Sequence, residues 1–189
     1  MAPRTISLAL IKTGRGLRKN DYYDPSLMRS PSRNTVLALI GVTLVLHTTE
    51  EYLTFPAFLS SPNRLPRWLP PPRLLLNPQS LHVALVMATV LPLAVIAWAI
   101  WRPCKALLVS VLFLECVLVV NAGWHLLAAW VTGGYAPGVI TAVLINLPFG
   151  VYVLRRAVRE QWIGARTAWQ MIAIALVLHI AALGSLLAG

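Results

Sequence analysis

The hydrophobic positions of this chain fall into five long runs, with no strand-like alternation of apolar and polar residues inside them. Each run approaches the ~20 apolar residues that a helix needs to cross a bilayer. Helices and closed barrels are the structures that satisfy every backbone polar group in lipid. We therefore predict an all-α fold, a polytopic membrane bundle of five transmembrane helices. The predicted spans are residues 35–59, 79–101, 106–131, 138–154 and 167–188.

Proline marks irregular places in this pattern. Pro92 and Pro148 lie inside the second and fourth predicted spans, and membrane helices tolerate such prolines, usually with a kink. Seven of the fourteen prolines lie in residues 56–78. Because proline has no backbone N–H to donate, this segment is predicted to be an extended loop and not a regular helix.

Charge is sparse and unevenly placed along the chain. Charged residues make up 12% of the sequence and hydrophobic residues 58%, and 16 Lys and Arg against 6 Asp and Glu give a net charge of +10. The basic residues lie in the tail and between the apolar runs, which is typical of membrane proteins. We therefore expect a lipid bilayer as the surrounding partner and no nucleic acid. Residues 1–34 are predicted to be a basic, partly disordered tail before a transmembrane bundle of residues 35–189.

The Lys and Arg residues also predict the orientation. Seven lie in the tail, two after the second helix and four after the fourth, which makes thirteen on one side, against three after the first helix on the other. The side richer in Lys and Arg faces the cytoplasm. We therefore expect an integral protein of the plasma or cytoplasmic membrane with a cytoplasmic N-terminus.

Three of the six acidic residues interrupt the apolar runs: Glu50, Glu51 and Glu115. An acidic side chain at the centre of a membrane helix costs at least ~2.5–3.5 kcal/mol, so such residues need partners and are candidates for function. His47 lies three and four residues before the first two, and these spacings put side chains on one face of a helix.

The third predicted helix carries a matching set. Asn121 and His125 are four residues apart, and Glu115 fits with them into an arc of ~120°. Under the predicted topology all four histidines of the chain fall in the outer half of the bilayer, His82 and His179 included. The pattern therefore predicts a buried cluster of His, Glu and Asn side chains from several helices.

Three short motifs in this region occur in order: HTTEE at residues 47–51, NAGWH at 121–125 and YAPG at 135–138. Through these motifs the chain resembles the HXXEE family of small integral membrane proteins over residues 35–155. That family is largely uncharacterised, so the resemblance implies membership and no chemistry.

A weaker similarity, in chemistry alone, is to the EXPERA-type sterol isomerases, which use a His-x-x-x-Glu pair, a further Glu and an Asn-x-x-Trp motif. His47 with Glu51, then Glu115, and Asn121 with Trp124 would stand for these elements. The chain departs from that pattern because Glu115 and Asn121 share one predicted helix.

Our first hypothesis is an intramembrane enzyme that uses acid–base chemistry to isomerise or cyclise a lipophilic small molecule. Glu51 and Glu115 would carry protons and His47 would orient or relay one. Trp124 would stabilise a cationic intermediate by cation–π attraction, and Tyr135 would contact the substrate. The candidate catalytic residues are His47, Glu50, Glu51, Glu115, Asn121 and His125.

Two other classes stay open at the level of the sequence. Histidine and carboxylate ligands suit a divalent metal such as Zn or Fe, with His47, Glu51 and His125 as the candidates, in a membrane hydrolase or oxidase. The third class is a non-enzymatic carrier or membrane subunit whose polar cluster lines a path, and a homo-oligomer would suit it. The sequence does not decide between a metal cofactor and none.

The predicted orientation is testable by labelling. We expect Ser26→Cys, in a chain without its two natural cysteines, to react with a membrane-impermeant maleimide only after the membrane is permeabilised. Ser61→Cys, in the loop predicted to lie outside, is the control and should react in intact cells or vesicles. Labelling of the tail position from the outside would contradict the charge-based orientation.

Overall fold

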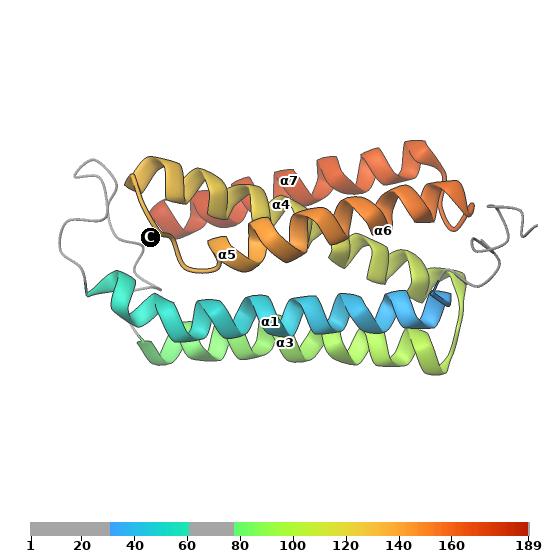
Figure 1. The fold of residues 1–189 in the computed structure, drawn as a ribbon, viewed down its shortest axis with the longest axis horizontal. Helices are drawn as coiled ribbons and strands as arrows, with labels where there is room; N and C mark the ends of the chain where they lie inside the picture. Colours follow the sequence, from blue (N-terminus) through green and yellow to red (C-terminus); the bar gives the residue numbers. More distant parts are fainter. Residues whose placement is uncertain (1–30, 61–77, 189) are drawn as a thin grey trace, which may run out of the picture. The chain divides into compact units, whose positions relative to one another are not determined.

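The structure is a computed structural model that describes residues 31–60 and 78–188. In these residues the regular structure is entirely helical, which confirms the predicted fold class (Figure 1). The elements are α1 (Arg33–Leu59), α3 (Pro78–Trp101), α4 (Lys105–Thr132), α5 (Val139–Thr141), the π-helix η3 (Ala142–Asn146), α6 (Leu147–Arg159) and α7 (Ala165–Ala188).

Five helices of the described chain are long and apolar enough to cross a membrane, as predicted. The fourth is composite, because α5, η3 and α6 run on as one helix from Val139 to Arg159. The chain is therefore an integral membrane protein. The predicted tail of residues 1–34 lies almost wholly outside the described residues.

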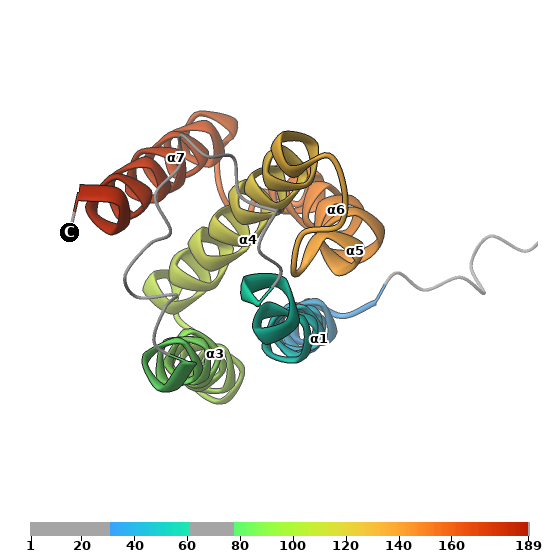
Figure 2. The same cartoon turned by 90° about the vertical axis from the view of Figure 1, so that its left-hand side faces the viewer.

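Helix α4 occupies the centre of the bundle (Figure 2). It packs against α3, α6, η3 and α7, while α1 packs mainly against α3. The buried core that joins these helices consists of aliphatic side chains, including Ile40 of α1, Leu112 of α4 and Val153 of α6. Large apolar side chains on the outer surface, such as Trp98 and Leu144, stay exposed, as expected for faces that contact lipid.

Local signals in the sequence set the helix ends. The Ser32 hydroxyl accepts a hydrogen bond from the Thr35 N–H at 3.1 Å and caps α1. Helix α4 ends at Gly133, which adopts φ +66°, a left-handed conformation that glycine takes at little cost.

Proline affects the helices less than the sequence suggested. Pro56 lies inside α1 and Pro78 begins α3, so the prediction of a loop over residues 56–78 was wrong at both of its ends. Proline removes only its own N–H from the helix, and the Pro56 carbonyl still accepts from the Ser60 N–H at 3.1 Å. The rest of that segment, residues 61–77, lies outside the described residues.

Pro148 has a clearer structural consequence. It follows directly on the π-helix, where the Leu147 N–H donates to the Ala142 carbonyl five residues back. Proline cannot donate to the carbonyl four residues earlier and its ring clashes there. The wider π turn accommodates Pro148 without ending the helix, and such turns are frequent at functional sites.

Two helical glycines of the bundle give a matched test of the packing. A Cβ at Gly150 would collide with Val119 and come within 2.9 Å of the Glu115 carboxyl, whereas a Cβ at Gly123 would meet nothing within 4 Å. We expect Gly150→Ala to destabilise the protein by about 1–3 kcal/mol through overpacking. We expect Gly123→Ala to be neutral or to stabilise by up to ~1 kcal/mol through helix propensity.

Thermal unfolding of the purified protein in detergent measures both effects. Equal unfolding temperatures for the two variants would contradict the close contact of α4 with α6 at Gly150.

Candidate functional site

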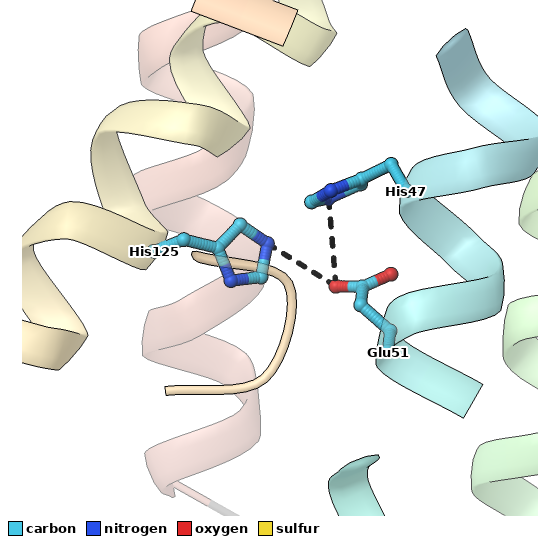
Figure 3. Close-up of side chains that lie close together, drawn as sticks. All are labelled: His47, Glu51 and His125. Carbon is cyan, nitrogen blue, oxygen red and sulfur yellow. Dashed lines mark ion pairs between the residues drawn. The ribbon is translucent and has the colours of Figure 1, made fainter. Parts of the chain in front are cut away.

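The side chains of His47 and Glu51 from α1 and of His125 from α4 converge on one point (Figure 3). One nitrogen of each imidazole and one oxygen of the carboxylate all lie within 4.8 Å of one another. The spacing of four residues puts His47 and Glu51 on the face of α1 that meets α4. We call these three residues the triad.

The contacts inside the triad are short and largely shielded. Glu51 Oε1 lies 3.2 Å from His125 Nε2 and 3.8 Å from His47 Nε2. The two imidazole rings meet edge to face with centroids 4.8 Å apart. The side chain of His47 is 2% exposed, and those of His125 and Glu51 are 11% and 13% exposed, so the triad opens on the side of the latter two.

A second layer of contacts fixes the ring of His47. Its Nδ1 lies 2.8 Å from Thr141 Oγ1, and that hydroxyl donates to Glu50 Oε2 at 2.6 Å. Because the hydroxyl proton points to Glu50, Thr141 accepts from His47, and Nδ1 must carry the ring proton. The Nε2 of His47 therefore presents a lone pair to the triad.

Asn121 binds both imidazoles. Its Nδ2 lies 2.9 Å from His47 Nε2 and 2.9 Å from His125 Nε2, and an amide nitrogen can donate to two acceptors at once. In this arrangement both Nε2 atoms carry lone pairs, so His125 Nε2 faces the Glu51 carboxylate with no proton of its own between them. The geometry therefore calls for a cation or a proton at the centre of the triad.

Glu50, the neighbour of Glu51, points elsewhere. Its carboxylate accepts from the Tyr135 hydroxyl at 2.8 Å and from the backbone N–H groups of Ile140 at 3.1 Å and Thr141 at 2.7 Å. These amides lie at the start of the composite helix, where a negative charge is favourable. Burial raises the pKa of Tyr135, so the phenol keeps the proton that it donates. Glu50 thus ties α1 to α5 and positions Thr141 for His47.

The turn after α4 covers the triad, as Figure 3 shows beside His125. Gly138 has φ +81°, and a Cβ there would lie 2.9 Å from the Cε1 atoms of both His47 and His125 and 3.1 Å from Glu51 Cγ. Both its conformation and its closeness to the triad require glycine at this position. The YAPG segment therefore supplies a partner for Glu50 through Tyr135 and a cover for the triad through Gly138.

The remaining candidates from the sequence lie around the triad or apart from it. His179 Nε2 lies 3.4 Å from Asn121 Oδ1, so His179 is next to the site, while His82 stacks on Tyr52 with ring centroids 4.6 Å apart. Trp124 is partly buried, and its Nε1 has no hydrogen-bond partner among the described residues. Glu115 is not part of the triad, because its carboxyl lies against Gly150 of α6.

Sequence reasoning missed two polar residues of the fourth span. Thr141 holds His47, and Asn146 is 1% exposed in η3. Both were available as signals, because they are the only polar side chains between Gly138 and Gly150.

One protein family, described as proteins of unknown function with an HXXEE motif, matches residues 38–153 of the chain. This match agrees with the resemblance carried by the three motifs. No curated protein and no solved structure matches the chain, so the similarity in chemistry to EXPERA-type sterol isomerases gains no support.

The different positions of the two adjacent glutamates predict different effects on stability. We expect Glu50→Ala to lower the free energy of unfolding by at least ~2 kcal/mol, because it removes several hydrogen bonds to a charged acceptor. Glu51→Ala should change it by less than about 1 kcal/mol, because Glu51 makes none of these bonds.

The measurement is thermal unfolding in detergent with a chelator present, so that no metal contributes. A greater loss of stability for Glu51→Ala than for Glu50→Ala would contradict the assignment of Glu50 as the residue that ties α1 to α5.

Proposed function

The chain belongs to this HXXEE family, and we propose that it is a metal-dependent membrane enzyme that hydrolyses a lipophilic substrate. His47, His125 and Glu51 would hold a divalent ion such as Zn²⁺. The observation that carries this proposal is the meeting of three lone-pair atoms, two imidazole nitrogens and one carboxylate oxygen, at one shielded point.

The donor set and its spacing suit such an ion. Two His and one carboxylate are the ligands of a known class of catalytic zinc sites, with metal–ligand distances of about 2.0–2.2 Å. Ligands at tetrahedral angles around such an ion lie about 3.3 Å apart. Glu51 Oε1 lies 3.2 Å and 3.8 Å from the two nitrogens, so the carboxylate oxygen is already close to the distance from each nitrogen that such an ion would require.

The surroundings of His47 also support a metal ligand. Ligating histidines donate their second ring N–H to a carboxylate or another fixed acceptor, which sets the tautomer and the ring orientation. His47 Nδ1 donates to Thr141, which is held in turn by Glu50. This arrangement fixes the nitrogen that faces the metal before any metal binds.

Asn121 would respond to the ion. It donates to the lone pairs that a metal would use, so metal binding requires its amide to turn. The turned amide would present its oxygen to the ion or to a water bound there. A catalytic zinc site keeps one position for water or substrate, and a bound Zn²⁺ lowers the pKa of that water toward 7.

The location of the triad supports a lipophilic substrate. All three residues lie within helices long and apolar enough to span a membrane, and large apolar side chains of α4 close to His125 in sequence, such as Leu126, are exposed. A substrate dissolved in the bilayer would reach the triad without leaving the lipid.

Metal-free acid–base chemistry, isomerisation or cyclisation, is the second candidate. A specific observation favours it, which is a continuous series of hydrogen bonds through the site. The series runs through Glu50, Thr141, His47, Asn121 and His125. In that case a proton carried by Glu51 would be donated to His125 Nε2 at 3.2 Å. The same residues would then exchange protons with the substrate in place of binding an ion.

Elemental analysis of the detergent-purified protein separates the two candidates. We expect about one divalent ion per chain in the wild type. We expect His47→Ala and His125→Ala to lose at least about tenfold in metal affinity, because the loss of a residue that only supports a ligand already costs about 10–100-fold. His82→Ala is the matched control and should keep the metal, because the ring of His82 contacts Tyr52 and His82 is not one of the residues whose ligand atoms converge in the triad.

Folded protein that holds no metal even after incubation with Zn²⁺, Fe²⁺ and Mn²⁺ would overturn the metal proposal in favour of acid–base chemistry. If the retained metal is iron, the hydrolytic part of the proposal is wrong, and oxidation is the reaction to assay.

A further inference from the structure

Two polar side chains away from the triad are buried without partners. Glu115 and Asn146 are each 1% exposed. Glu115 Oε2 and both polar atoms of the Asn146 side chain, Nδ2 and Oδ1, have no hydrogen-bond partner among the described residues. Such groups are rare in folded proteins and especially costly in a membrane span.

The two side chains share one interface. Glu115 Oε1 lies against Gly150, on the face of α6 that packs on α4. Asn146 precedes Gly150 by four residues, which places it on the same face about 5–6 Å away. Helix α4 also packs against η3, which ends at Asn146. The absence of a side chain at Gly150 leaves the room that the Glu115 carboxyl occupies.

Among the residues that the structure describes, no cationic side chain forms a salt bridge with Glu115. The buried arginine of the same helix, Arg156, is engaged with Glu160, at 2.7 Å from its Nε to Glu160 Oε1. A buried carboxyl without a cationic partner is accommodated at least cost as the neutral acid. An acid O–H and an amide both need partners, and water supplies donors and acceptors to both where a site is polar.

We propose that Glu115 and Asn146 form a second site, between α4 and the composite fourth helix, that binds one proton together with buried water. Its ligand is a proton held on the Glu115 carboxyl, with water bridging that carboxyl to the Asn146 amide. This site needs no metal and stands independently of the proposed function.

The position of the second site along the fourth helix suggests a role for its proton. Asn146 lies five residues after Thr141, at most about 7.5 Å farther along the helix axis, and Thr141 binds His47. Asn146 therefore stands between Glu115 and the triad. If the triad acts as proposed, the second site is a proton store within one or two helical turns of the reaction.

Infrared spectroscopy of the metal-free protein tests the site directly. We expect the carbonyl band of a protonated, hydrogen-bonded carboxyl that shifts in D₂O and is lost in Glu115→Gln. In Asn146→Leu, or Asn146→Ala if that variant folds better, the band should move to the higher frequency of a less hydrogen-bonded acid. An O–H band that shifts in H₂¹⁸O should be present in the wild type and lost in Glu115→Gln.

Thr43→Val is the matched control, because Thr43 is a buried polar residue whose hydroxyl donates within its own helix, at 2.9 Å to the Ile40 carbonyl. It should leave both bands unchanged.

Absence of the carboxyl band would overturn proton binding. Two results would overturn the water bridge. One is a carboxyl band whose frequency is the same in the Asn146 variant as in the wild type. The other is a carboxyl band that moves in the Asn146 variant when the wild type shows no water O–H band. Metal content is measured separately and should be unchanged in Glu115→Gln, so failure of this site and failure of the proposed function are distinguishable.

Discussion

The candidate site depends on one carboxylate that binds the start of a helix. Glu50 accepts from two backbone N–H groups and from the hydroxyl of Thr141. Inside a bilayer these N–H groups have no water to bind, so each needs a partner within the protein. By meeting that need, Glu50 orients the Thr141 hydroxyl, and this hydroxyl fixes the ring of His47. The tautomer of His47 thus follows from the capping of a neighbouring helix.

The two adjacent glutamates of the motif make different contacts. Consecutive helix residues point about 100° apart, so Glu50 turns toward α5 while Glu51 turns toward His125. Of the two successive glutamates of the motif, Glu50 therefore makes the structural contact to the turn, and Glu51 belongs to the triad. The conformation of Gly138 completes the arrangement, because the turn can lie against both imidazoles only without a side chain there.

The acidic residues Glu51 and Glu115 differ in the exposure of their side chains. Glu51 meets two imidazoles and is partly exposed, which suits a group that exchanges ligands or protons with a substrate. Glu115 is 1% exposed, and its carboxyl lies against Gly150 of α6. The two carboxyls therefore differ in access, because the side chain of Glu51 is partly exposed whereas that of Glu115 is buried.

The sequence by itself determined the fold class and the five spans, because an apolar run of sufficient length has one stable form in lipid. It also identified His47, Glu51, Asn121 and His125, because buried polar side chains stand out in apolar helices. Only the tertiary structure showed that Glu115 lies outside the triad and that Glu50 and Glu51 have different partners. Only it showed that Thr141 contacts His47. Helical spacing gives the face of a residue on its own helix, but which neighbouring helix meets that face depends on how the helices pack, and periodicity within one segment carries no such information.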